Sequence, residues 1–240
     1  MSFTLLFDLD GTLVDTDPLH FQAYLELLAG EGRPTIDFHF YRARIMGFGH
    51  DDIFRMLFPN DGEARRRRLS EEKERTFRRL LRDRVLEPRG GLIEVLDWAR
   101  ARGYRCGVVT NAPRENAALM LEALRLGDRF DTVVLGEELP RPKPDPLPYA
   151  TGLAELGGRA EAAIAFEDSL SGVHSASAAR IFTVGIHAVL LPEALRQAGA
   201  AHTIDDFHDP WLWAELARRS ASSALSATTH LPSLSKESES

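Results

Sequence analysis

The sequence predicts an α/β fold in which a doubly wound, Rossmann-like parallel sheet carries an inserted α-helical cap domain. Short apolar runs alternate with helix-length segments along most of the 240 residues, and this alternation is typical of right-handed crossovers in a parallel sheet. A gap of roughly one hundred residues separates the first two apolar runs, whereas a simple strand-helix-strand unit needs ~30. That excess predicts an insertion.

The elements of the predicted core are assigned from apolar runs and the segments between them. Buried strands are expected at 3–7, 106–109, 132–135, 162–166 and 181–184, because each run is short and apolar. Helices are expected at 91–102, 113–124 and 146–156. These elements build the sheet and its flanking layers.

The long gap carries helical periodicity of its own. Phe21, Tyr24, Leu25 and Leu28 are spaced i, i+3, i+4 and i+7, and a second apolar set follows this pattern at Phe77, Leu80, Leu81 and Val85. The predicted cap therefore spans 17–88, with Gly90 and Gly91 as the return hinge. The catalytic core is assigned to 1–16 and 89–218. Residues 219–240, rich in Ser, Ala and Thr, are expected to form a disordered tail.

Composition and charge narrow the possible partners. The formal net charge of -7 argues against nucleic acid, and no apolar run has membrane-spanning length. The run Arg65 to Arg68 is interpreted as a solvated helix face, because acidic residues follow it at once. A single cysteine, Cys106, and an N-terminus without a secretory pattern predict a cytoplasmic protein. We expect a monomer or a weak homo-oligomer.

Acidic residues follow the first and fourth predicted strands. Asp8, Asp10 and Gly11 come after the first strand, and Glu167 and Asp168 after the fourth. Ligands of open parallel sheets bind beyond the carboxyl ends of the strands. Clustered carboxylates there suit Mg²⁺, and they leave one carboxylate to attack phosphorus and another to exchange protons. Taken alone, each acid is equally compatible with an acidic turn or a helix cap.

Two further signals complete the predicted site. Thr110 and Asn111 follow the second strand at a helix start, a position that suits an anion but also an ordinary N-cap. Lys143 lies between Pro142 and Pro144, which restrict its backbone and favour a directed ammonium that neutralises phosphate. The alternative is a proline-rich loop that precedes a helix.

These motifs resemble those of the haloacid dehalogenase superfamily, in its phosphatase and phosphomutase branch. The resemblance covers about residues 3–187 and rests on Asp8-Leu9-Asp10-Gly11-Thr12, Thr110-Asn111, Lys143 and Glu167-Asp168. It implies that Asp8 is the nucleophile and that Asp10 protonates the leaving alcohol and then activates water. It implies that Mg²⁺ is held by Asp8, Asp10 through its backbone carbonyl, and Asp168, with Glu167 as ligand or orienter. Thr110, Asn111 and Lys143 would hold the phosphoryl group.

The resemblance also indicates the substrate class. Relatives that cleave carbon-halogen bonds lack an acid at the position of Asp10, and the helical cap is similar to that of enzymes acting on small molecules. In the cap, His20 and His50 are expected to contact substrate phosphate, although His50 stands where a phosphomutase has an arginine. Arg42 or Arg44 is an alternative source of that charge. We therefore expect a Mg²⁺-dependent phosphatase for sugar phosphates or similar metabolites. A mutase of the β-phosphoglucomutase type and a non-catalytic regulatory protein remain alternatives.

Overall fold

A parallel sheet forms the centre of the molecule. The computed structural model describes residues 3–46, 48–82, 84–187 and 190–228. Within these residues the strands are β1 (Thr4–Phe7), β2 (Arg105–Thr110), β3 (Thr132–Leu135), β4 (Ala163–Glu167), β5 (Phe182–Ile186) and β6 (His202–Ile204), in the order β3-β2-β1-β4-β5-β6. Neighbouring strands all pair in parallel. The chain winds outward from β1 in both directions, which confirms the predicted fold class.

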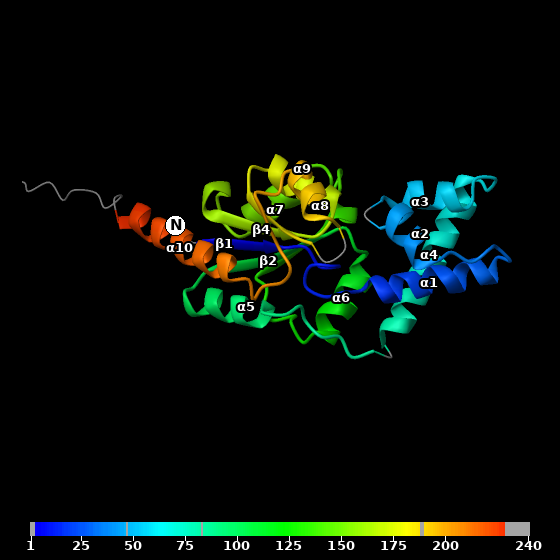
Figure 1. The fold of residues 1–240 in the computed structure, drawn as a ribbon, viewed down its shortest axis with the longest axis horizontal. Coiled ribbons are helices and arrows are strands. Elements are labelled where there is room, and N and C mark those ends of the chain that lie inside the picture. The colour runs from blue at the N-terminus through cyan, green and yellow to red at the C-terminus, as the bar shows by residue number, and fades with distance from the viewer. Residues whose placement is uncertain (1–2, 47, 83, 188–189, 229–240) are drawn as a thin grey trace, which may run out of the picture.

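Helices cover both faces of this sheet (Figure 1). On one face α5 (Leu92–Ala101), α6 (Arg114–Ala123) and α10 (Pro210–Thr228) bury apolar side chains in a core shared with β1, β2 and β4. The other face carries α7 (Leu147–Glu155), α8 (Leu170–Ala178) and α9 (Pro192–Ala198). Two short 3₁₀ turns lie at Gly136–Glu138 and Ala160–Ala162. The sheet is therefore sandwiched, and its carboxyl edge is left for loops.

Two parts of the core differ from the sequence predictions. Strand β6 lies in no predicted run, because only three residues pair with β5 and the segment begins with a histidine. Helix α10 continues to Thr228, so the predicted disordered tail from 219 begins too early. Its residues make specific contacts there: the Arg219 guanidinium lies 3.6 Å from the Phe182 ring centroid, and the Ser220 hydroxyl lies 2.5 Å from that of Tyr104. The remainder, 229–240, lies outside the described residues.

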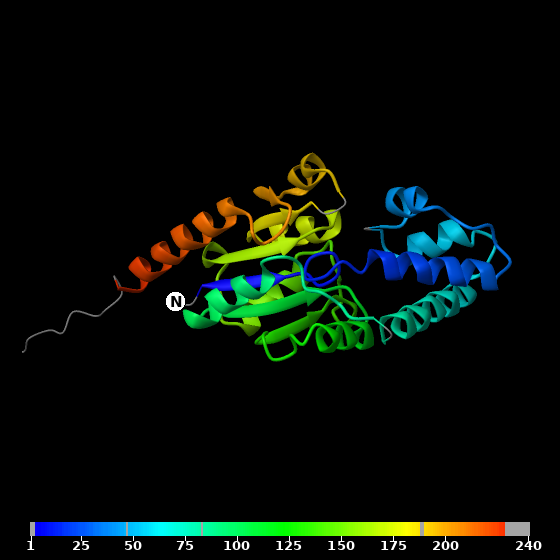
Figure 2. The ribbon, with the colours of Figure 1, turned by 60° about the horizontal axis from the view of Figure 1, so that its bottom comes forward.

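Between β1 and α5 the described residues form four helices, which group at one end of the molecule and which we call the cap helices (Figure 2). They are α1 (Asp17–Gly30), α2 (Phe38–Arg44), α3 (His50–Leu57) and α4 (Glu63–Arg82). They share an apolar cluster that includes Tyr24, Tyr41, Phe54 and Leu69, while the start of α1 and the end of α4 pack into the sheet core. Val85 does not continue the apolar face of α4 as predicted, because α4 ends before it and its side chain is 87% exposed. The domain bounds at 17–88 stay a prediction.

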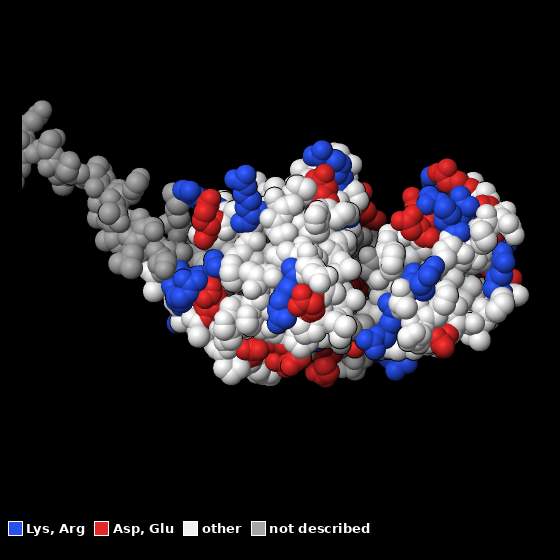
Figure 3. Space-filling view, turned by 45° about the horizontal axis from the view of Figure 1, so that its top comes forward, with Lys and Arg blue, Asp and Glu red and all other residues white. Residues whose placement is uncertain are grey.

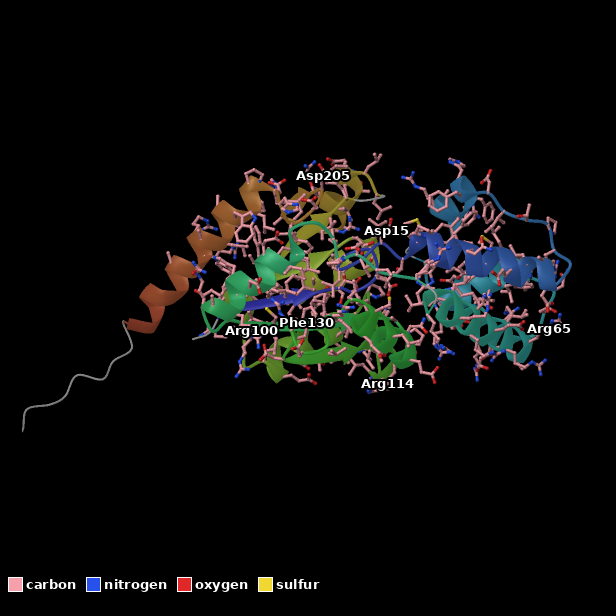
Figure 4. All side chains as sticks on the ribbon, turned by 90° about the horizontal axis from the view of Figure 1, so that it is seen from below. Asp15, Arg65, Arg100, Arg114, Phe130 and Asp205 are labelled. Atoms are coloured by element: carbon pink, nitrogen blue, oxygen red, sulfur yellow. The ribbon has the colours of Figure 1, made fainter. Side chains whose placement is uncertain are left out.

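The segment that leads from the cap helices back to the core, at Gly90 and Gly91, packs against the core and is hydrogen-bonded to it. The Phe207 N–H donates to the Gly90 carbonyl at 2.9 Å, and a side chain at Gly91, whose φ is +76°, would collide with the Phe207 backbone. At the opposite end of the cap helices lies Arg65 (Figure 4). Arg65 pairs with Glu31 and Asp61, as expected for a solvated charged face. In the part of the chain that the structure describes, no helix is long and apolar enough to cross a membrane.

Candidate active site

Three carboxylates meet at the carboxyl edge of the sheet. Strands β1 and β4 are neighbours, so Asp8, directly after β1, comes close to Glu167 at the end of β4 and to Asp168 after it. One oxygen from each of the three lies within 4.8 Å of the other two. Asp8 is 8% exposed and Glu167 is fully buried. Parallel pairing thus collects acids that are about 160 residues apart in the chain.

Lys143 is the buried cation of this cluster. Its ammonium donates to Asp8 Oδ1 at 2.6 Å, to Glu167 Oε1 at 2.5 Å and to the Val109 carbonyl at 2.7 Å. Burial alone would lower the pKa of Lys143, but the negative charges of Asp8 and Glu167 outweigh it and raise the pKa to about 12. The raised pKa favours the charged ammonium, which is directed at Asp8.

Glu167 acts as an anchor for that ammonium. The Tyr149 hydroxyl donates to Glu167 Oε1 at 2.8 Å, and the Ser169 hydroxyl donates to Oε2 at 3.2 Å. A side chain at Gly172 would fall about 2 Å from the Glu167 carboxylate, so only glycine fits at that turn of α8. Because both oxygens already accept hydrogen bonds, Glu167 is better placed to orient Lys143 than to bind a metal. Tyr149 was not expected from the sequence.

The Asp168 carboxylate has fewer hydrogen-bond donors than that of Glu167 and is therefore more available to a metal ion. Its Oδ1 accepts a hydrogen bond from the Thr12 hydroxyl at 3.2 Å, and Oδ2 has no donor among the described residues. Gly11, with φ of +78°, permits its approach, because an added Cβ would lie 2.0 Å from Asp168 Oδ2. Burial, and then the charges of Asp8 and Glu167, raise the pKa of Asp168 well above its usual value.

The donor set fits a hard divalent cation. Burial raises the pKa of Asp8 too, against the opposing effect of Lys143, so the buried site disfavours its charged form unless a further cation is bound; three carboxyl groups share one ammonium. Oxygen ligands that are close together and short of positive charge suit Mg²⁺ or a similar ion. Asp8 and Asp168 are the residues that fit this role.

Asp10 lies beside this cluster with a different environment. Its Oδ1 accepts hydrogen bonds from the Thr16 hydroxyl at 2.6 Å and from His20 Nε2 at 3.2 Å. Burial alone would raise the pKa of Asp10, but the hydrogen bonds from His20 and Thr16 outweigh it and lower the pKa. Two neighbouring acids, Asp8 and Asp10, thus have pKa values shifted in opposite directions.

A polar chain connects Asp10 to the cap helices and back to the core. His20 Nδ1 lies 2.7 Å from the ammonium of Lys73, which also donates to Glu74 Oε1 at 2.9 Å. Glu74 Oε2 accepts from the Asn116 amide of α6 at 2.6 Å. Because Lys73 donates to Nδ1, the His20 proton lies on Nε2 and is donated to Asp10. Lys73 and Glu74 are almost fully buried.

Sequence reasoning missed Lys73, Glu74 and Asn116, although a signal was present. Leu69, Lys73, Phe77 and Leu81 are spaced by four residues and are all buried on α4. Lys73 therefore lies on the apolar stripe of the helix, where an unpaired ammonium is costly. The charged residues around Lys73 instead suggest a solvated helix face.

The predicted phosphate-binding residues differ in availability. Thr110 is 1% exposed, and its hydroxyl accepts from the Ala112 N–H at 3.0 Å. The Asn111 side chain instead makes two hydrogen bonds to the backbone of Lys143. Its Nδ2 donates to the Lys143 carbonyl at 3.2 Å, and its Oδ1 accepts from the Lys143 N–H at 3.2 Å. Asn111 therefore positions Lys143. His50 lies on α3, with Nε2 3.6 Å from Glu74 Oε1 and Nδ1 3.3 Å from the Ser70 hydroxyl.

A cavity of about 790 Å³ joins these groups. Asp8, Asp10, Lys143 and Asp168 line its core end, and residues of α1, α3 and α4 line the opposite end. His20, His50, Thr110 and Asn111 also line it, whereas Glu167 lies behind Lys143. Figure 3 shows the hollow between the core and the cap helices, with acidic side chains on both sides. The volume suits a small molecule.

The chain is similar to a family of hydrolases and to proteins named as phosphatases. Residues 5–186 match the model of the family described as haloacid dehalogenase-like hydrolase. A phosphorylated carbohydrates phosphatase of Thermotoga maritima is 35% identical over 205 residues, which cover 82% of this chain and 91% of that protein. A phosphoglycolate phosphatase of Pseudomonas syringae pv. tomato is 31% identical, with 76% and 68% covered.

Solved structures agree on the architecture. CbbY from Rhodobacter sphaeroides, a mutant in complex with xylulose-1,5-bisphosphate, aligns with a TM-score of 0.76 at 25% identity over 87% of this chain and 96% of that chain. A β-phosphoglucomutase from Clostridium difficile aligns with a TM-score of 0.77 over 94% of this chain and all of the other, but at 20% identity. That second likeness shows the fold alone.

Proposed function

The chain belongs to the haloacid dehalogenase-like hydrolases, and from this premise we propose that it is a phosphoric monoester hydrolase that acts on small phosphate esters, sugar phosphates foremost, through a phosphoryl group carried on Asp8. The observation that carries the proposal is the position of Asp8. Its carboxylate lies at the core end of a small-molecule cavity, 2.6 Å from a buried ammonium and next to Asp10.

The residues have distinct roles in the proposed reaction. Asp8 attacks phosphorus and forms an acyl phosphate, while the alcohol oxygen leaves with a proton from Asp10. Lys143 neutralises the charge that gathers on the transferred group and on Asp8. Water then attacks the acyl phosphate, and Asp10 takes its proton. Thr110 lines the same end of the cavity and supplies a hydroxyl.

Asp10 must act first as an acid and then as a base. Its lowered pKa suits the base. A bound phosphate dianion is a like charge, so it raises the pKa of Asp10 and favours the protonated form that the first step requires. The His20 and Thr16 donors then favour the carboxylate again once the alcohol has left. The same side chain thereby changes role without moving.

Asp8 and Asp168 would hold Mg²⁺, together with the Asp10 carbonyl that the family resemblance implies. The ion supplies charge neutralisation for the phosphate oxygens and for the carboxylate cluster. We propose Mg²⁺ as the resident ion and the cytoplasm as the location of the protein.

The test is phosphate release from sugar phosphates, phosphoglycolate and an aryl phosphate, with Mg²⁺ or with EDTA. We expect Mg²⁺-dependent release that Asp8→Asn abolishes. Asp205→Asn is the matched control, because Asp205 is 87% exposed and lies on the core surface away from the cavity (Figure 4). Thermal unfolding verifies that both variants fold.

Two outcomes would redirect the assignment. Conversion between sugar phosphate isomers that depends on a bisphosphate activator, with little free phosphate, would indicate a mutase. Folded wild-type protein without turnover in either assay would indicate a regulatory protein. Release that survives Asp8→Asn would remove Asp8 as the nucleophile.

A further inference from the structure

The end of the cavity that faces the cap helices is lined with acids. Asp17, Asp51, Asp52 and Glu74 line it from the cap helices, and Glu137 lines it from the core. Figure 3 shows acidic side chains on both sides of the hollow. A substrate whose phosphate is bound at Asp8 places its distal end among these acids.

The cationic side chains that line the cavity already have anionic or hydrogen-bonding partners. Among the described lining residues, Lys73 and Lys143 are the cationic side chains, apart from the histidines. Lys143 is held between Asp8 and Glu167. Lys73 is 2% exposed, donates to Glu74 and His20, and lies 4.9 Å from the Tyr24 ring centroid. Neither ammonium is available to a second anionic group of the substrate.

His50 does not supply the missing charge. Both of its ring nitrogens face partners, Glu74 and Ser70. Burial, and then the neighbouring Lys73, lower its pKa against the opposing effect of Glu74. A neutral, doubly engaged imidazole is a poor receptor for a phosphate.

The N-terminus of α3 is also closed to anions. Asp51 and Asp52 lie in its first turn and already complement the positive end of the helix. Asp52 pairs with Arg55 at 2.8 Å, whereas Asp51 has no ion-pair partner among the described residues. Asp51 therefore presents its carboxylate to the cavity.

We propose that this acid-lined end selects phosphate monoesters whose distal group is a hydroxyl or an amine and rejects sugar bisphosphates, with Asp51 as a specificity-determining residue. The proposal rests on the proposed function, because it takes the phosphoryl site at Asp8 as given. A second phosphate would meet the Asp51 carboxylate, which has no ion-pair partner among the described residues, and neither ammonium of the lining is available to it. A hydroxyl or an ammonium would find acceptors.

The experiment compares kcat/KM for glucose 6-phosphate, glucosamine 6-phosphate and glucose 1,6-bisphosphate. For the wild type we expect the bisphosphate to be at least about tenfold poorer than the monophosphates, a gap that narrows as added salt screens the repulsion. In Asp51→Lys we expect kcat/KM for the bisphosphate, relative to that for glucose 6-phosphate, to rise by about fivefold. The kcat/KM for glucosamine 6-phosphate should fall relative to the same reference. Asp51→Asn should give intermediate shifts.

Glu71→Lys is the matched control. Glu71 is exposed on α4 and does not line the cavity, so this variant makes the same change in net charge at a different place. It should leave the ratios unchanged. The inference would be overturned if the wild type had the same kcat/KM for the bisphosphate as for the monophosphates. It would also be overturned if Asp51→Lys and Glu71→Lys changed the ratios of kcat/KM equally.

Failure of the proposed function gives a different result. Folded protein that releases phosphate from none of the three compounds would refute the phosphatase, and the selectivity is then read from binding. Asp8→Asn protein titrated with the same compounds should bind the monophosphates at least about tenfold more tightly than the bisphosphate. Equal affinities would reject the inference independently of turnover.

Discussion

Lys143 is held by a carboxylate that is itself held by a phenol. Tyr149→Phe removes the hydroxyl that donates to Glu167 at 2.8 Å and leaves the buried ring in place. Losing a hydrogen bond to a charged group should lower the free energy of unfolding by ~1.5–3 kcal/mol. Lys143 keeps its own contacts in this variant, so kcat should fall by only roughly tenfold. Removing a donor that itself contacts the transition state typically lowers kcat by ~10²–10³-fold.

Tyr104→Phe is the control for Tyr149→Phe, since the Tyr104 hydroxyl contacts Ser220 and does not line the cavity. Urea unfolding and steady-state kinetics of both variants give the comparison. Equal losses of kcat would mean that Tyr149 does not position Lys143.

Gly11 has both a left-handed backbone conformation and a close contact with Asp168, whereas Gly32 has only the left-handed conformation. Both Gly11 and Gly32 have positive φ, +78° and +62°, but an added Cβ meets Asp168 at 2.0 Å only at Gly11 and open space at Gly32. Gly32→Ala should therefore lose only the ~1–2 kcal/mol of left-handed strain. Gly11→Ala should lose more and should raise the Mg²⁺ concentration for half-maximal activity by about tenfold, because Asp168 is displaced.

Unfolding curves and Mg²⁺ titrations of phosphate release measure the two effects of Gly11→Ala. An unchanged Mg²⁺ requirement in this variant would contradict a ligand role for Asp168.

Helix α4 is linked to α6 of the core through Glu74. Burial alone would raise the pKa of Glu74, but the charge and hydrogen bond of the adjacent Lys73 ammonium outweigh it and lower the pKa from 4.5 to about 2. At ~1.4 kcal/mol per unit this corresponds to about 3 kcal/mol of stability at pH 7. Because the folded pKa is depressed, this stabilisation is present above about pH 4.5 and is lost as the pH falls toward 2.

Glu74→Gln keeps the side-chain size and removes the charge, so it should unfold more easily than the wild type at pH 7. The difference should shrink as the pH is lowered from 5 to 3.5. The exposed Glu71→Gln on the same helix should show neither effect. Urea denaturation across this pH range measures both variants, and a deficit that does not change with pH would refute the electrostatic origin.

The elements that could be predicted from sequence are those with a strong local pattern. The buried runs of β1 and β4 and the acids that follow them, Asp8 and Asp168, were placed correctly because parallel strands end at one edge. Strand β6 was missed because three residues carry too little periodicity. The assignments of Asn111 and Lys73 depended on neighbours distant in sequence, Lys143 and His20, and no local pattern encodes such contacts.

For the whole molecule, the carboxylate cluster opposes folding unless a cation is bound. Asp8, Glu167 and Asp168 are gathered around one ammonium, and like charges in a buried site repel each other. A cation that binds only the folded state stabilises it by about 2.7 kcal/mol at one hundred times its Kd, or roughly 5–10 °C in Tm for a chain of this size. We therefore expect Tm to rise with Mg²⁺ and to fall in EDTA.

Asp168→Asn separates this stability effect from activity. Removing one of the like charges should make the variant as stable as the wild type or more stable in EDTA, while its gain in Tm with Mg²⁺ should disappear. The two proteins therefore exchange rank when the metal is added, a result that general damage to the fold cannot produce. Scanning calorimetry with and without Mg²⁺ tests it, and a variant that is less stable in both conditions would mean that Asp168 serves packing. The exchange would show that the cluster is retained at a cost to the metal-free fold, as expected of residues selected for binding and not for stability.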